Sequence, residues 1–258
     1  MKLAVCVKHA VDEAELRADP AGRPVLQGAA TKMSTFDKNA VEEGLRIKSK
    51  CGPGTELVIF TVGPSDAKKT IKEAIAMGAD SAVLVVSENA ERDAFVTASL
   101  VAKAIGASGT FDLILCAEGS SDTYDVQVPA MLGELLSLPY VGCASKIDLD
   151  GSSAKILETY EESAQTIEAA LPLVVSVQSE INEPRYPTLV QIMQASKKPI
   201  QEYTPAQLAG ADGPKKRLEI RETKVQSMNR KKVVFEGAPA ETAQKLLNAL
   251  RTEGVISR

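Results

Sequence analysis

The chain has 258 residues, of which 44% are hydrophobic and 25% are charged, and its formal net charge is −4. These values are typical of a globular protein, and the acidic net charge gives no reason to expect nucleic acid as a partner. No run of about 18 apolar residues is present, so we expect no direct insertion into a membrane.

The first 180 residues alternate short apolar runs with helical patterns. We expect strands at 2–9, 55–63, 81–87 and 111–119, and helices at 37–50, 65–80, 91–108 and 125–138. Apolar runs without alternation are typical of strands buried on both faces of a parallel sheet, joined by right-handed crossovers. The sequence therefore predicts a doubly wound, Rossmann-like α/β domain, in which ligands bind beyond the carboxyl ends of the strands.

The pattern changes after Pro139. A β-hairpin with its turn at 148–153 and a last strand at 171–178 are expected next, as an insertion in the sheet. The remaining residues, 199–258, are charged and weakly periodic until a C-terminal amphipathic helix that carries Leu246, Leu247 and Leu250. Such a tail is stable only if its apolar residues are buried, either on its own domain or on a partner subunit.

The cysteines and the histidine indicate no catalytic or metal site. Cys6, Cys51, Cys116 and Cys143 form no CxxC pair, which predicts free thiols in a reducing cytoplasm. His9 is the one histidine, and the sequence offers it no partner for hydrolytic chemistry.

Three predicted strand ends, at 6–12, 61–67 and 116–129, meet at one edge of the sheet. The last of them is rich in small and hydroxyl residues before a helix, where backbone N–H groups favour a phosphate. Neither GxGxxG nor GxxxxGK[ST] occurs, so the sequence leaves two interpretations of this segment, a phosphate-binding loop and a purely structural turn. Nearby, Asp37 is a candidate helix N-cap, and the adjacent Glu42 and Glu43 favour a solvated helix face over paired-carboxylate catalysis.

Four collinear blocks of the sequence carry a resemblance to a known family. They are "VKHAVD" (7–12), "AVEEGLRIK" (40–48), "TIKEAIAMGAD" (70–80) and, most specifically, "NEPRYPTLVQIMQASKKPI" (182–200). Together they make the chain similar, over about its whole length, to the β subunit of electron transfer flavoprotein.

The resemblance implies a heterodimer in which an α subunit binds most of an FAD. The β subunit would carry AMP, or a second FAD in an electron-bifurcating variant. The pair would carry electrons between flavoprotein dehydrogenases and a quinone oxidoreductase, so the chain would be a carrier subunit and not an enzyme. A different class also stays open, a nucleotide-binding regulatory or ATP-hydrolysing module on the same kind of sheet.

The resemblance also implies the nucleotide contacts, with Phe36 near the flavin of the α subunit. They are Cys6, Val7, Lys8, Ser34, Thr35, Phe36, Asp37, Val62, Gly119, Ser120, Ser121, Asp122, Thr123, Tyr124, Asp125, Val126, Gln127 and Val128. Three departures from the family pattern leave both AMP and FAD as candidates for the nucleotide bound by this chain. Ser34-Thr35 replaces Asn-Pro, Pro129 replaces a glycine, and Glu13 replaces a tyrosine.

By the same resemblance, residues 186–200 form a docking segment for partner dehydrogenases, between an α/β domain at 1–185 and an arm at 201–258 that packs on the α subunit. The docking residues are Tyr186, Leu189, Ile192, Met193 and Lys197. Leu189 would fill a partner pocket, and the prolines at 184 and 187 would limit the entropy lost on docking. The other interpretation is that the apolar residues form a small satellite core.

Overall fold

A nine-stranded sheet organises the chain in the computed structural model, which describes residues 1–87, 93–210, 213–225 and 231–256. The strand order is β11-β10-β9-β12-β8-β1-β6-β7-β13. The strands are β1 (Lys2–Cys6), β6 (Glu56–Gly63), β7 (Ser81–Val86), β8 (Leu113–Ala117), β9 (Tyr140–Asp150), β10 (Ser153–Thr159), β11 (Ala164–Ala170), β12 (Leu173–Val177) and β13 (Ile200–Tyr203).

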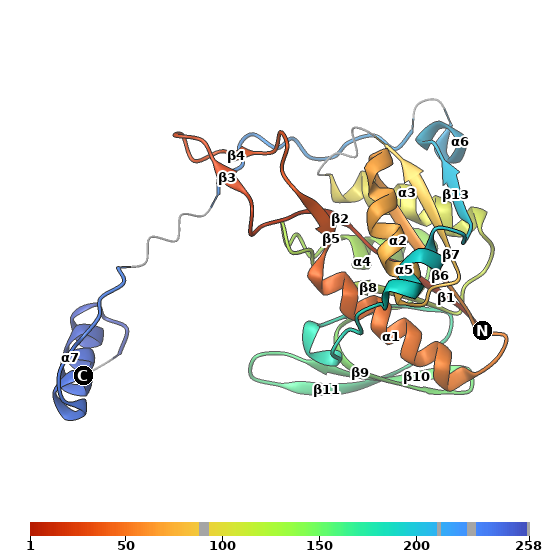
Figure 1. Cartoon of the computed structure of the whole chain (residues 1–258). Coiled ribbons are helices and arrows are strands. Elements are labelled where there is room, and N and C mark those ends of the chain that lie inside the picture. Colours follow the sequence, from red (N-terminus) through yellow and green to blue (C-terminus); the bar gives the residue numbers. More distant parts are fainter. Residues whose placement is uncertain (88–92, 211–212, 226–230, 257–258) are drawn as a thin grey trace.

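Helices cover both faces of this sheet (Figure 1). One layer contains α1 (Thr35–Cys51), α2 (Lys68–Met77) and α5 (Leu189–Ala195), and the other contains α3 (Ala94–Ala107), α4 (Val128–Leu136) and α6 (Pro205–Ala209). Alternate residues of β1 supply the two cores, with Leu3 and Val5 on the α1 side and Ala4 on the α3 side. The predicted doubly wound α/β fold is therefore confirmed, and β10 and β11 form its antiparallel hairpin extension.

The strand order reverses between β1 and β8. From β1 the chain moves through α1 to β6 and through α2 to β7 on one side, whereas β8 pairs in parallel with the other edge of β1. Loops that leave two neighbouring strands in opposite directions open a crevice at their carboxyl ends. The segments that follow Cys6 and Ala117 flank this position.

Some local expectations were wrong. The helix expected at 125–138 begins at Val128, because Tyr124 and Val126 have φ angles of 49° and 55°, outside the right-handed helical region. The N-cap of α1 is Ser34, so Asp37 lies inside the first helical turn and is not the cap. The strand expected at 2–9 stops at Cys6.

Between that strand and α1 the chain makes an excursion that the sequence did not predict. It contains two short antiparallel ribbons, β2 (His9–Val11) with β5 (Thr31–Met33), and β3 (Arg17–Ala18) with β4 (Pro24–Val25). Strands of two or three residues carry too little apolar periodicity to be recognised. Two short 3₁₀ turns, η1 (Ser65–Ala67) and η2 (Ser179–Ile181), follow the carboxyl ends of β6 and β12.

The C-terminal part leaves the sheet in steps. β13 pairs in parallel with β7, α6 packs on α3, and Val225 then donates a 2.8 Å backbone hydrogen bond to Gly22 beside the β3–β4 ribbon. The helix α7 (Pro239–Thr252) stands away from the sheet in Figure 1 and buries none of its residues. Within the described ranges, no helix is both long and apolar enough to cross a membrane.

Candidate functional site

Lys8 occupies the crevice at the reversal of strand order. It follows β1, and its ammonium donates to Asp122 Oδ1 at 2.7 Å, to Ser120 Oγ at 3.1 Å and to Thr123 Oγ1 at 3.1 Å, all in the loop after β8. Burial raises the pKa of Asp122, but the hydrogen bond and charge of Lys8, together with hydrogen bonds from Ser120 and the Thr123 backbone, outweigh burial, so this pKa lies below its ordinary value. Thr123 in turn donates from Oγ1 to Asp125 Oδ2 at 2.9 Å, so the cluster places a cation among hydroxyl groups and two aspartate side chains.

Asp37 lies beneath this cluster. Its Oδ2 accepts a 2.6 Å hydrogen bond from the backbone N–H of Lys8, which ties the first turn of α1 to the end of β1. Burial raises the pKa of Asp37 to about 7, although the backbone hydrogen bond and the charge of Lys8 oppose the shift. Near neutral pH this carboxyl is therefore partly protonated, whereas a solvent-exposed aspartate is almost fully ionised.

Ser121 carries the clearest sign of an incomplete site. Its backbone N–H donates to Ser34 Oγ at 3.2 Å, which joins the loop after β8 to the start of α1. Its own Oγ is buried and has no hydrogen-bond partner, a property shared among the described residues only by Thr61 Oγ1 on β6. A buried hydroxyl without a partner costs free energy, so a ligand that accepts from it or donates to it would be favoured.

An aromatic wall borders the same loop. Tyr124 and Phe36 meet edge to face with their ring centroids 5.5 Å apart, and Tyr124 donates from its OH to Glu118 at 2.6 Å. This hydrogen bond and partial burial raise the pKa of Tyr124 to about 12. Glu118 lies within the predicted strand end at 116–129, but its pairing with Tyr124 could not be predicted, because it depends on the positive φ angle of Tyr124.

The other predicted nucleotide residues divide between the surface and the core, and Val7 is buried in the core on the α1 side of the sheet. Thr35 and residues 125–127 are exposed, and Gln127 forms the N-cap position of α4, whose first turn contains Pro129. Cys6 and Val62 instead contact the core cluster beneath α3 and α4. The donor set of ammonium, hydroxyl groups and a helix N-terminus suits a phosphate group, which fits an adenine nucleotide. No described group in it is arranged as a nucleophile with a base.

The predicted docking segment is exposed on α5 and just before it. Exposed fractions are 90% for Tyr186, 73% for Leu189, 51% for Ile192 and 67% for Met193. The satellite core that the sequence left open does not form among the residues that the structure describes; Ala195 alone in α5 is buried, against α2. Lys197 is exposed directly after the helix.

The interpretation of Glu42 and Glu43 as a solvated helix face was wrong. Both are buried, with exposed fractions of 4% and 5%. Glu42 accepts hydrogen bonds from Arg185, and Glu43 accepts a 3.1 Å hydrogen bond from Asn182. Their partners stand about 140 positions later in the chain, which is why local sequence could not reveal the burial.

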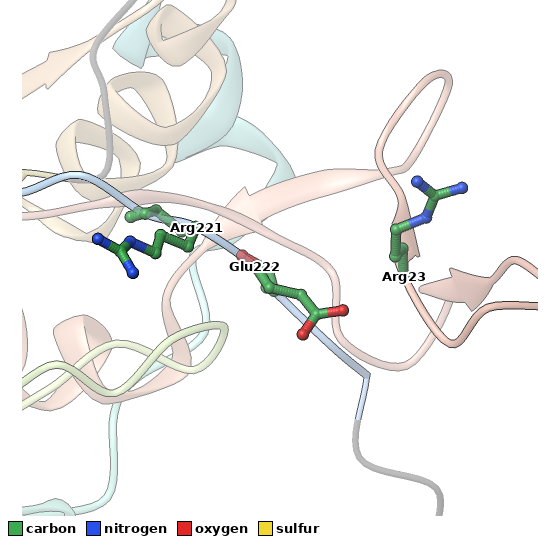
Figure 2. A pocket seen from close by; sticks show the side chains of 5 residues that line it. Arg23, Arg221 and Glu222 are labelled. Carbon is green, nitrogen blue, oxygen red and sulfur yellow. The ribbon is translucent and has the colours of Figure 1, made fainter.

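A second hollow, shown in Figure 2, lies between the β3–β4 ribbon and the C-terminal arm. It is lined by Arg23, Ile220, Arg221, Glu222 and Thr223. The labelled side chains point in different directions and do not converge on a common point (Figure 2). Neither Lys8 nor any residue of the loop after β8 lines it, so the Lys8 cluster remains the candidate binding site.

Comparisons with known proteins agree with the resemblance. The profile of the electron transfer flavoprotein domain matches residues 25–208. The chain is 32% identical over 258 residues to electron transfer flavoprotein subunit beta of Bacillus subtilis, covering 99% of this chain and 100% of the relative. It is 35% identical over 251 residues to the protein of the same name from Bradyrhizobium diazoefficiens, covering 96% and 98%. For that of Thermoanaerobacterium thermosaccharolyticum the identity is 29% over 263 residues.

Proposed function

The chain belongs to the electron transfer flavoprotein β-subunit family, and on this premise we propose that it forms one half of a heterodimeric electron carrier. Its partner would be an α subunit that binds most of an FAD. The pair would accept electrons from flavoprotein dehydrogenases and pass them to a quinone oxidoreductase. The chain itself would bind and position the cofactors and would catalyse no reaction of its own.

The observation that carries the nucleotide part of this proposal is the unpartnered Ser121 hydroxyl beside the Lys8 cluster. We infer that the phosphate of an AMP molecule lies in the crevice between β1 and β8. Lys8 would neutralise its charge, while the hydroxyl groups and the N-terminus of α4 would donate to its oxygens. The nucleotide would then act as a structural ligand that fixes the loop after β8.

The flavin supplies the one-electron and two-electron chemistry when it is bound between the subunits. In this proposal Phe36 and Tyr124 border the side of the chain that faces it, because Tyr124 is 48% exposed and its ring packs against that of Phe36. Their apolar faces would exclude water from the ring system. No proton transfer by a residue of this chain is required.

The test is to purify the chain together with its α subunit, extract the bound nucleotides, and count flavin and AMP per heterodimer. One flavin and one AMP would support the proposal. Two flavins and no AMP would instead identify an electron-bifurcating variant. A colourless protein that hydrolyses ATP would overturn the proposal in favour of a regulatory or ATP-hydrolysing module.

A further inference from the structure

A network of polar side chains fastens the segment before α5 to the middle of α1. Asn39 donates from Nδ2 to the backbone oxygens of Ser179, at 2.9 Å, and of Asn182, at 2.8 Å. In return Asn182 donates to the backbone oxygen of Asn39 at 3.0 Å and to Glu43 at 3.1 Å. These reciprocal hydrogen bonds fix the path of the backbone just before the docking segment.

The strongest contact in this network joins Arg185 and Glu42. The guanidinium donates from Nε to Oε2 at 2.7 Å and from Nη2 to Oε1 at 3.0 Å, and the backbone N–H of Arg185 donates to Oε2 at 3.2 Å. Such a bidentate fork fixes direction as well as distance, and a lysine cannot reproduce it. Burial raises the pKa of Glu42, but the hydrogen bonds and charge of Arg185 together with the hydrogen bond from Arg46 outweigh burial and keep this pKa below its ordinary value.

The far end of the docking segment is fastened as well. Lys198 donates from Nζ to the backbone oxygen of Ala79 at 2.6 Å, and Ala82 donates from its backbone N–H to the oxygen of Pro199 at 3.2 Å. Between these two ends, Ala195 is buried against α2, while the large apolar side chains of α5 face outward. The segment is therefore a short bridge that is held at both ends and exposed in between.

We propose that Glu42 is a positioning residue for docking: acting through Arg185, it holds residues 186–197 in the orientation that a partner dehydrogenase binds. The inference rests on the docking role of this segment in the proposed function. Glu42 itself is buried and would not contact the partner. Its role would be to order the segment before the encounter.

The physical effect of this clamp is preorganisation. A free segment loses conformational entropy when a partner orders it, at about 1–2 kcal/mol for each residue whose backbone is fixed. Fastening the segment in advance removes part of this cost from binding. Because Phe36 and Asp37 lie on the same helix as Glu42, the clamp also fixes the docking surface relative to the candidate nucleotide crevice.

Arg46 provides a matched control. It is the second arginine on the same carboxylate, donating from Nε to Glu42 Oε1 at 3.1 Å, but it belongs to α1 and not to the docking segment. Arg185→Met and Arg46→Met each remove one guanidinium from Glu42 and keep an unbranched apolar stem of similar length. They differ in whether the docking segment is released.

Both variants are prepared as the complete heterodimer with its flavin, and two measurements are made. The first is amide hydrogen exchange across 186–197, which needs no partner. The second is kcat and apparent KM for reduction of the bound flavin by a purified flavoprotein dehydrogenase that reduces the wild-type pair. For Arg185→Met we expect exchange at least about tenfold faster and a KM about tenfold higher, equivalent to about 1.4 kcal/mol. We expect kcat to change little, and Arg46→Met to match the wild type in both measurements.

Three results would overturn the proposal. They are unchanged exchange in Arg185→Met, faster exchange without a change in KM, and an equal rise in KM for Arg46→Met. Failure of the docking role itself is a distinguishable result. In that case Leu189→Ala would leave the KM unchanged, while the exchange comparison would still report whether Arg185 orders the segment.

Discussion

The ammonium of Lys8 lies 2.7 Å from the carboxylate of Asp122, although the two residues are 114 positions apart in the chain. Their ion pair bridges the two strand ends at the point where the strand order reverses. Lys8 therefore sits where a phosphate would enter, with its charge already partly balanced. If a nucleotide binds here as proposed, its phosphate would compete with this carboxylate for the charge of Lys8.

Replacing Lys8 should weaken nucleotide retention. In Lys8→Gln the carboxylate of Asp122 is no longer compensated and repels a phosphate, so we expect the affinity for AMP to fall at least about tenfold. The measurement is calorimetric titration of AMP into the nucleotide-free heterodimer. Lys48→Gln is the control, since it also removes a lysine from an ion pair, with Asp80 at 2.6 Å, but at the opposite end of α1. Equal losses in both variants would contradict the assignment.

Ser121→Ala should change stability in opposite directions with and without a nucleotide. The unpartnered hydroxyl carries a desolvation cost of about 1–3 kcal/mol in the empty protein, so its removal should raise the free energy of unfolding. In the presence of AMP the variant loses a hydrogen bond, and the stabilisation by the nucleotide should shrink. Thermal melting with and without AMP measures both effects. Ser145→Ala, which removes a hydroxyl already bonded to Thr159 at 2.7 Å, should only destabilise.

Asp37 should make stability fall as pH rises towards neutrality. Its pKa is raised from 3.8 to about 7 in the folded protein, so folding binds a proton between these values. The destabilisation is absent below about pH 4, grows through pH 4–7 and is complete above pH 7, where it is on the order of 4 kcal/mol. Asp37→Asn should therefore be more stable than the wild type at pH 8 and similar at pH 4. Melting curves of both proteins across this range are the measurement, and a constant difference would contradict the burial argument.

The fold could be predicted where the signal is local. Long apolar runs at 55–63 and 111–119 predicted the buried strands β6 and β8, because a parallel sheet covered on both faces needs no polar alternation. The start of α4 could not be predicted, because the φ angle of Val126 depends on how the whole loop packs. Glu42 shows a second limit. Its position on a helix predicted a solvated side chain, because the sequence does not show that folding brings Arg185, 143 positions away, into contact with it.

Asp93 should control the path of the C-terminal arm. Its Oδ1 caps α3 by accepting from the N–H groups of Phe95 and Val96, while Oδ2 accepts from the N–H groups of Arg217, at 2.6 Å, and Leu218, at 2.9 Å. We expect Asp93→Ala to lose about 1–2 kcal/mol of stability through the missing cap and to expose the arm to trypsin.

The variant Asp93→Ser separates the two roles of this carboxylate. A serine hydroxyl can cap α3 but lacks a second oxygen for the arm, so most of the stability should return while the arm stays as sensitive to trypsin as in Asp93→Ala. Protection of the arm in the serine variant would show that the carboxylate does not hold it.

Leu189 should matter for binding and not for folding. With 73% of its surface exposed, Leu189→Ala should change the free energy of unfolding by no more than about 0.5 kcal/mol, as is usual for surface sites. The same truncation in the core, Leu132→Ala, should cost about 2–5 kcal/mol, because Leu132 is fully buried. If Leu189 is the plug of the docking surface, its loss should cost about 2 kcal/mol or more of partner affinity, roughly thirtyfold. Thermal melting and dehydrogenase-dependent reduction of the flavin measure the two effects, with flavin content expected to stay constant. A lower melting temperature with unchanged partner affinity would assign Leu189 to an interface inside the heterodimer and remove the support for docking.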